Sequence, residues 1–213
     1  MTVPPASAAP TASDGADATP QAALERLLAG NRRFAAGTPS HPHQSANHRQ
    51  LLTGGQSPYA VVLGCSDSRA SVELLFDQGF GDVFVVRNAG QVVGRAGSAQ
   101  ASIEFAVAEL GVQVVFVLGH ESCGAVAATV AHLAGGGDLP GAMPILVDLT
   151  REHLDPEDPS HDAVRRHVAG TVQDLLAEST IVAEAVADGR VVVAGGVYGL
   201  EDGLVRPVED ARA

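Results

Sequence analysis

Three apolar runs of strand length constrain the fold of this chain more than any other feature; they cover residues 59–64, 83–86 and 113–118. Most of their residues are β-branched or aromatic, and the runs lack the polar–apolar alternation of a half-exposed strand. Continuous apolar runs are typical of strands buried on both faces, as in a parallel sheet. Because helical patterns separate the runs, we expect an α/β fold with a mostly parallel central β-sheet flanked by helices.

The N-terminal part of the chain predicts a tail and a helical arm. Residues 1–18 are rich in Ala, Pro, Ser, Thr and Asp and contain no apolar segment, which is typical of a disordered tail rather than a secretory signal. Leucines at helical spacing then indicate a helix over 20–36 that ends at Gly37 and Pro39. Since no second linker and no internal repeat follow, residues 19–213 are expected to form a single domain.

Towards the C-terminus the alternation of helix and strand continues. A long helix is expected over 160–187, after a break that ends at Pro159. The run of valines at 191–194 predicts a fourth strand, and 198–205 is a candidate edge hairpin. Ligands of open parallel sheets bind beyond the carboxyl ends of the strands. Side chains that follow the apolar runs are therefore the first candidates for a functional site.

Composition excludes several classes of function. The 213 residues include 25 acidic and 13 basic side chains, with a formal charge of −12, and all 13 basic residues are arginine. A nucleic-acid partner is not expected, because such affinity depends on clustered Lys and Arg. The absence of lysine also excludes Schiff-base and P-loop chemistry. No stretch reaches the roughly 18 apolar residues of a membrane span, and two cysteines that are not needed as a disulfide fit a cytoplasmic protein.

The only two cysteines, Cys65 and Cys123, lie in short motifs directly after two of the apolar runs. The first motif reads CSDSR from Cys65, and the second reads HESCG from His120, where His120 and Cys123 are expected to share a helix start. Two thiolates and one imidazole suit Zn²⁺, and three protein ligands leave the fourth position open, as in catalytic zinc sites. We therefore expect one zinc ion per subunit, held by Cys65, His120 and Cys123, in a metal-dependent lyase or hydrolase.

Asp67 lies within reach of the same ion, and Arg69 lies within reach of Asp67. If Asp67 binds zinc the site is closed, whereas a bidentate pair with Arg69 would leave the fourth position to water. In an open site Zn²⁺ lowers the pKa of bound water from about 15.7 towards about 7. Because two thiolates offset the charge of the metal, activity is expected to rise at alkaline pH. The alternative is that Asp67 and Arg69 form a purely structural ion pair.

The two motifs and their surroundings resemble the β-class carbonic anhydrases, which interconvert CO₂ and bicarbonate. C-x-D-x-R is followed further along by H-x-x-C, and FDQGFGDVFVVRNAG, SIEFAVAELGV and VLGHESCGAV are also similar to that family. The likeness covers about residues 20–205 and is densest from 56 to 128. It implies hydration of CO₂ by zinc-bound hydroxide, with Asp67 and Arg69 as the catalytic dyad that orients the hydroxide or gates the site.

The resemblance also implies a substrate pocket and an assembly. Gln56 stands where plant-like members place a glutamine that hydrogen-bonds the substrate. The other implied pocket positions are Phe84, Ala89, Phe105 and Gly124. A homodimer is implied as the basic unit, with homotetramers common, and Gln56 and Phe105 are candidates for completing a partner's pocket. Val62 stands where some bacterial members carry a tryptophan of an inhibitory bicarbonate site, so such inhibition is not implied here.

The residues alone are also compatible with other functions. The same zinc site could hydrolyse a related small molecule such as CS₂ or COS, or a zinc- and redox-sensing module could release the metal on oxidation of its thiols. A Cys–His thiol hydrolase is disfavoured because two thiols converge on one histidine. The remaining histidines fall in loops or on polar helix faces and are predicted to be mostly solvated; they are His41, His43, His48, His132, His153, His161 and His167.

Overall fold

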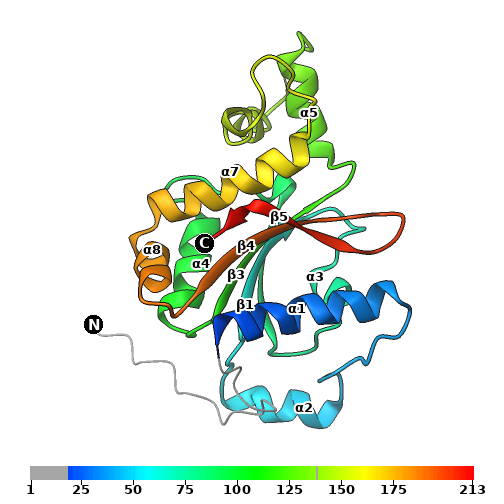
Figure 1. The fold of residues 1–213 in the computed structure, drawn as a ribbon, viewed down its shortest axis with the longest axis vertical. Helices are drawn as coiled ribbons and strands as arrows, with labels where there is room; N and C mark the ends of the chain where they lie inside the picture. The colour runs from blue at the N-terminus through cyan, green and yellow to red at the C-terminus, as the bar shows by residue number, and fades with distance from the viewer. Residues whose placement is uncertain (1–18, 138) are drawn as a thin grey trace.

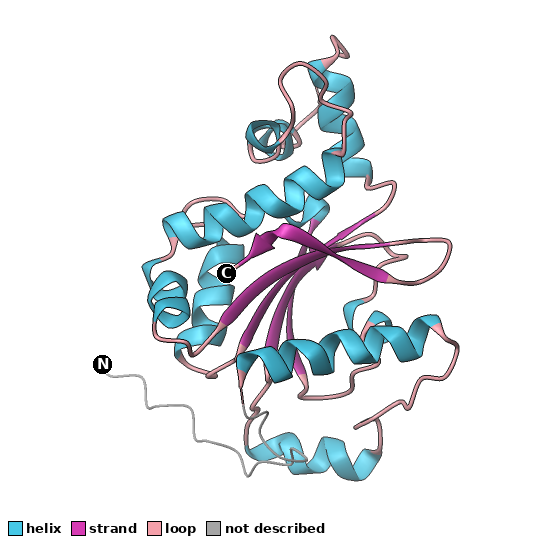
Figure 2. Cartoon of the chain, viewed as in Figure 1, coloured by secondary structure: helices cyan, strands magenta, loops and turns pink. Residues whose placement is uncertain are grey.

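The computed structural model describes residues 19–137 and 139–213, so the predicted tail over 1–18 lies outside the described residues. A five-stranded sheet with the order β2-β1-β3-β4-β5 forms its centre (Figure 1 and Figure 2). Its strands are β1 (Ala60–Cys65), β2 (Val83–Asn88), β3 (Val114–His120), β4 (Val192–Tyr198) and β5 (Val205–Arg212). The first four strands run parallel and β5 is antiparallel to β4, which confirms the predicted α/β fold with a mostly parallel sheet.

Helices cover both faces of the sheet, as Figure 1 shows. One face carries α1 (Pro20–Ala35) and α3 (Val72–Leu75), and the other carries α4 (Ser98–Ala108), α7 (Ala163–Glu178) and α8 (Thr180–Ala187). The remaining helical elements are α2 (Ala46–Leu51), α5 (Gly124–Leu133), α6 (Pro144–Asp148), and the 3₁₀ segments η1 (Leu52–Gly54), η2 (Ala89–Gln91) and η3 (Arg151–His153). Among the helices that the structure describes, none combines the length and apolarity needed to cross a bilayer.

Burial on both faces explains why the strand sequences do not alternate. Every residue of β1, β3 and β4 is buried, whereas β2, at the edge of the sheet, is only partly buried, so the prediction of burial on both faces is wrong for the run 83–86. On β1, Val61 and Leu63 pack in the core beneath α4, α7 and α8, while Val62 packs in the core beneath α1 and α3. Each fully buried Val or Leu contributes about 1.5–3 kcal/mol relative to an exposed one. The three inner strands, β1, β3 and β4, are therefore the most firmly held part of the sheet.

The N-terminal arm is confirmed, and it packs on the sheet of its own subunit. Thr19 caps α1 by accepting a hydrogen bond from the Ala22 N–H (3.1 Å), and Pro20 occupies the first turn. The buried side chain of Asn31 joins α1 to two distant segments, because its amide donates to Leu75 O (3.0 Å) and its oxygen accepts from Val205 N (2.7 Å). The hydrogen bonds of Asn31 thus fix the N-terminal arm to α3 and β5.

Two predictions for the C-terminal part are wrong in extent. The long helix expected over 160–187 is two helices, α7 and α8, because Ser179 leaves helical geometry and accepts a hydrogen bond from Val182 N (3.2 Å) as the cap of α8. The hairpin expected over 198–205 is only its turn, since β4 ends at Tyr198 and β5 begins at Val205. That residues 19–213 form a single domain stays a prediction.

Candidate metal centre

Cys65 and His120 are the last residues of two adjacent parallel strands, β1 and β3. Gly64 pairs with Leu118 across the two strands, so both strands end at the same edge of the sheet. The expected strands ended at residues 64 and 118, which is one and two residues too early. Because both side chains leave a strand that is hydrogen-bonded to neighbours, their backbone positions are set by the sheet rather than by a loop.

Cys123 reaches the site from a tight turn after β3. Ser122 has a positive φ of 54°, and Cys123 follows as the N-cap residue of α5. The expectation that His120 and Cys123 share a helix start is therefore wrong for His120, which still belongs to the strand. The N-terminus of α5 lowers the pKa of Cys123 through the backbone N–H groups of Val126 and Ala125, but the neighbouring Cys65 raises that pKa by more.

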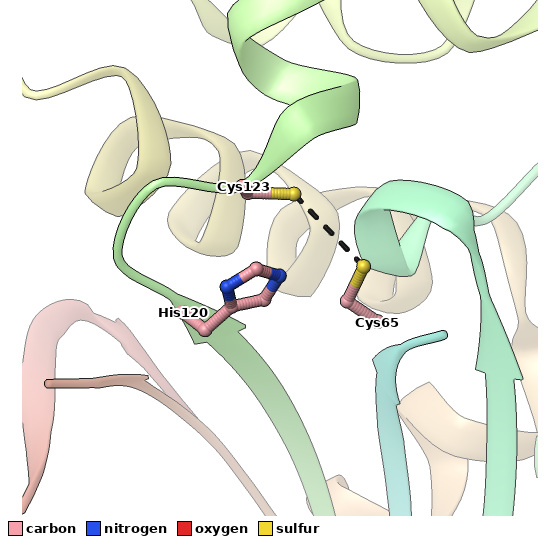
Figure 3. A group of neighbouring side chains, drawn as sticks. All are labelled: Cys65, His120 and Cys123. Carbon is pink, nitrogen blue, oxygen red and sulfur yellow. Dashed lines mark hydrogen bonds between the residues drawn. The ribbon is translucent and has the colours of Figure 1, made fainter. Parts of the chain in front are cut away.

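The three side chains converge as the sequence motifs predict (Figure 3). Their ligand atoms all lie within 4.8 Å of one another, and all three residues are buried. The two sulfurs are 4.0 Å apart and both cysteines are free, so they do not form a disulfide. Tetrahedral zinc with Zn–S bonds of about 2.3 Å would hold two sulfurs about 3.8 Å apart. The separation in the structure fits that ion.

The hydrogen bonding of His120 leaves one ring nitrogen for a metal. Its Nδ1 lies 2.9 Å from Glu121 O, and because a carbonyl oxygen only accepts, Nδ1 carries the hydrogen. Nε2 is then a lone-pair acceptor, and this buried atom has no hydrogen-bond partner among the described residues. Buried polar atoms are rarely left unpaired. A metal ion at Nε2 would satisfy it, and the donor set of two thiolates and one imidazole suits zinc.

The two thiols shift each other's pKa in opposite directions. The pKa of Cys65 is lowered and that of Cys123 is raised, in both cases chiefly because of the hydrogen bond between the two sulfurs. Backbone N–H groups of Gly90 (3.3 Å) and Asp67 (3.4 Å) also point at the Cys65 sulfur and favour its anion. Since zinc binds thiolates, zinc binding has to displace any proton that the two thiols carry.

Asp67 is clamped by Arg69 beside the three ligands. The guanidinium donates from Nε to Oδ1 (2.9 Å) and from Nη2 to Oδ2 (2.7 Å), and the Arg69 backbone N–H adds a third bond to Oδ1 (2.9 Å). These bonds hold the pKa of Asp67 well below its usual range. Asp67 Oδ2 remains 3.8 Å from His120 Nε2. Arg69 also reaches Ser122 O (3.3 Å) and thereby joins the two motifs.

Sequence reasoning missed two residues that support this geometry. Arg87 donates to Cys65 O (2.8 Å) and Asp67 O (2.7 Å), which fixes the backbone of the first motif. The Asn88 side-chain amide donates to Val92 O (2.8 Å), and its oxygen accepts from Val92 N (2.8 Å). These two hydrogen bonds shape the turn that contains Gly90. The available signal was their position: two polar residues end the apolar strand β2, next to the strand that carries Cys65.

The implied pocket residues lie at different places. Ala89 and Gly124 are exposed and adjoin Gly90 and Cys123, next to the ligands. Phe84 and Phe105 contact each other with ring centroids 6.2 Å apart, but Phe84 precedes Asn88 by four residues of β2, about 13 Å along the strand. Gln56 is exposed and precedes β1, at the opposite end of that strand from Cys65. The structure therefore brings Ala89 and Gly124 to the ligands, and leaves Gln56, Phe84 and Phe105 apart from them within one subunit.

The family model that matches this chain and two of its curated relatives are described as carbonic anhydrases. The family described as Carbonic anhydrase matches residues 60–205. Among curated relatives, carbonic anhydrase 2 of Mycobacterium tuberculosis is 44% identical over 193 residues, covering 86% of this chain and 90% of the relative. The carbonic anhydrase of Pseudomonas aeruginosa is 35% identical over 184 residues, covering 81% of this chain and 82% of the relative.

Solved structures show the same likeness. A Coccomyxa β-carbonic anhydrase in complex with acetazolamide superimposes with a TM-score of 0.67 at 30% identity, covering 87% of this chain and 86% of that one. A tetrameric β-carbonic anhydrase of Sordaria macrospora shares the fold, with a TM-score of 0.70 at 24% identity over 89% of this chain and 98% of that one. A family match that spans both ligand motifs, on a sheet that brings those motifs together, establishes that this chain belongs to the β-class carbonic anhydrases.

Proposed function

We propose that this protein catalyses the reversible hydration of CO₂ to bicarbonate and a proton. The observation that carries the proposal is the cluster of Cys65, His120 and Cys123, with an ionised carboxylate held at its edge. Zinc held by these three residues supplies a water activated for attack near neutral pH. The chain itself supplies the buried ligand atoms, a free lone pair on His120 Nε2, and the orientation of Asp67.

We propose that Asp67 orients the attacking water rather than closing the site. Arg69 takes both carboxylate oxygens from one side, and a bidentate pair of this kind resists the rotation needed to bind the metal. An ionised carboxylate only accepts hydrogen bonds. Asp67 Oδ2, which faces the ligand cluster, is therefore suited to accept from the O–H of the nucleophile and to direct its lone pair at the carbon of CO₂.

We propose that the substrate pocket is completed by a second copy of the chain. Ala89 and Gly124 lie beside the ligands, while Gln56 and Phe105 are exposed and remote from the ligands of their own subunit. The Gln56 amide and the Phe105 ring of one copy would serve a partner's pocket. Large apolar side chains are also exposed at Leu74 (59%) and Phe80 (52%), as expected for surfaces buried by assembly.

Assembly is expected to be directly measurable. Light scattering coupled to size exclusion should show a dimer or tetramer of the 21.7 kDa chain at micromolar concentration. Replacing the exposed Phe105 by aspartate should shift the distribution to smaller species, because a desolvated carboxylate at an interface is costly. A protein that stays monomeric at all concentrations and is still active would contradict the shared pocket.

We further propose a cytoplasmic location. Both cysteines are reduced in the structure and serve as metal ligands in the proposed site. A reducing compartment keeps such thiols available.

The function is tested by stopped-flow CO₂ hydration with metal analysis. The purified protein should contain one zinc per chain and accelerate hydration, and activity should rise from neutral towards alkaline pH. Removal of the metal with a chelator should abolish activity, and zinc should restore it. Bound zinc without hydration at pH 8.5 would indicate a sensor, and activity that survives metal removal would indicate a thiol enzyme. Parallel assays with COS and CS₂ test the related hydrolase activity.

A further inference from the structure

A chain of hydrogen bonds leads from Cys65 through two histidines to the protein surface. The Gly90 N–H points at the Cys65 sulfur (3.3 Å), and Gly90 O accepts from His167 Nε2 (2.7 Å). His167 Nδ1 lies 2.8 Å from His153 Nδ1, and His153 Nε2 lies 2.8 Å from Asp174 Oδ2. We propose that His167 is a positioning residue that acts on the ligand Cys65 through the backbone of Gly90. We further propose that protonated His153, paired with Asp174, holds His167 in the tautomer with its hydrogen on Nε2. This inference rests on the proposed zinc site.

His167 is not the solvated residue that the sequence predicted. It is fully buried on the face of α7 that packs against β3 and β4, and η3 places His153 against it. Burial lowers the pKa of His167 to about 4, so the ring is neutral near pH 7. A neutral imidazole has one N–H and one lone pair. Since Gly90 O only accepts, the hydrogen of His167 is on Nε2 and the lone pair is on Nδ1.

These roles fix the protons of His153. The lone pair on His167 Nδ1 requires an N–H from His153 Nδ1. The carboxylate of Asp174 also only accepts, so it requires an N–H from His153 Nε2. A ring with hydrogens on both nitrogens is an imidazolium. We therefore assign His153 as an imidazolium beside the Asp174 carboxylate, because a single hydrogen would leave one of the two bonds with facing lone pairs.

Two glycines make room for this arrangement. Gly90 has a φ of +81°, which lets its N–H face Cys65 while its carbonyl faces His167, and a Cβ there would lie 3.0 Å from that of Ala125. Gly170 sits inside α7, where a Cβ would lie 2.1 Å from Cδ2 of the His153 ring. Glycine within a helix costs about 1 kcal/mol relative to alanine. Its presence at 170 is explained by the close approach of His153.

The outer end of the chain is accessible to solvent. The Asp174 side chain is 41% exposed and that of His153 is 9% exposed. A pocket beside His153 is lined by further ionisable groups from η3, from α7 and its N-cap residue, and from β5, namely Glu152, Asp162, Arg165, Arg166 and Asp210. Acidic and basic groups are both present around His153. The pair with Asp174 is thus the one direct ionic contact of His153 among the described residues.

The first test uses zinc affinity, measured by chelator competition at pH 7.5 on the full-length protein. His167→Leu keeps the bulk but removes the N–H to Gly90, and we expect zinc to bind about 10-fold more weakly. His167→Gln places an amide N–H near the position of Nε2 and should restore affinity to within about 3-fold of the parent. His161→Leu, at an exposed histidine outside this chain of bonds, is the matched control. Equal affinities for the parent and His167→Leu would overturn the proposal.

The second test reads the protons directly in the zinc-bound protein. Nitrogen-15 NMR of labelled histidine at pH 7.5 should show His153 with two N–H groups and His167 with one. In Asp174→Asn the amide can donate to His153 Nε2, so His153 should lose its extra proton and the chain of bonds should persist. A singly protonated His153 in the parent protein would refute the proposal. A parent protein that binds no zinc would instead refute the proposed function, so the two failures are distinguishable.

Discussion

Replacing Cys123 by serine is expected to lower kcat/KM for CO₂ hydration by about 10³-fold or more and to remove most of the bound zinc. A serine hydroxyl stays protonated near pH 7 and is a much poorer zinc ligand than a thiolate. The geometry offers no substitute, because Asp67 is held by Arg69 and stands 3.8 Å from His120 Nε2. Cys65→Ser should have an effect of the same size.

The measurement is stopped-flow hydration together with zinc content on the same preparation. Ser66→Ala is the matched control, since Ser66 is an exposed neighbour of Cys65 whose side chain belongs to no part of the proposed site. Circular dichroism should show that both cysteine variants keep the α/β fold, because the sheet and its two cores form independently of these side chains. A Cys123→Ser protein that retains full zinc and full activity would show that the cluster is not the catalytic site.

Asp67→Asn is expected to reduce kcat/KM by about 10- to 100-fold while leaving one zinc per chain. Asparagine has nearly the same shape, but its NH₂ group would face an Arg69 nitrogen that also donates, so one of the two parallel bonds is lost. Arg69→Lys keeps the positive charge but loses the planar fork, and we expect a loss of about 10-fold. Arg49→Lys, at an exposed arginine on α2, serves as the control.

The pH dependence of this loss follows from the pKa of Asp67. Arg69 depresses it below the ordinary value of about 3.9. The contribution of the carboxylate is therefore fully present above that ordinary value, and is lost only as the pH falls through the lowered pKa. Between pH 6 and 9 the ratio of parent to Asp67→Asn activity should stay constant. Unchanged activity in Asp67→Asn would mean that the Asp67–Arg69 pair is purely structural.

The main elements of the fold and the three ligands could be predicted because their signals are local. Continuous apolar runs predicted parallel strands, and parallel strands end at one edge. Burial on both faces was predicted correctly for β1 and β3 but not for the edge strand β2. Cys65 and His120 followed two such runs directly. The convergence of Cys65 and His120 could therefore be predicted without knowing how the side chains pack. The strand ends were misjudged because hydrogen bonding to neighbours extends β1 and β3 past the last strongly apolar residue.

The supporting residues could not be predicted, because their roles depend on contacts between distant segments. His167 resembles any polar residue in the sequence RRHVAG, and only the docking of η3 and α7 against the sheet buries it. Arg87 bonds to backbone atoms of a neighbouring strand, which no local pattern specifies. Two signals were available in the sequence. Gly170 inside a predicted helix indicated a close approach, and Ser179 indicated a helix start.

The three ligands are anchored differently, and this difference predicts the order in which they would release a bound metal. Cys65 and His120 leave strands that are paired on both sides, so moving either one requires breaking the sheet. Cys123 follows an exposed two-residue turn with Ser122 at a positive φ, and this turn can open while the sheet stays intact. We therefore expect loss of a bound metal to begin at Cys123, while Cys65 and His120 stay in place. The lifetime of the loaded enzyme would then depend on this turn rather than on the stability of the whole protein.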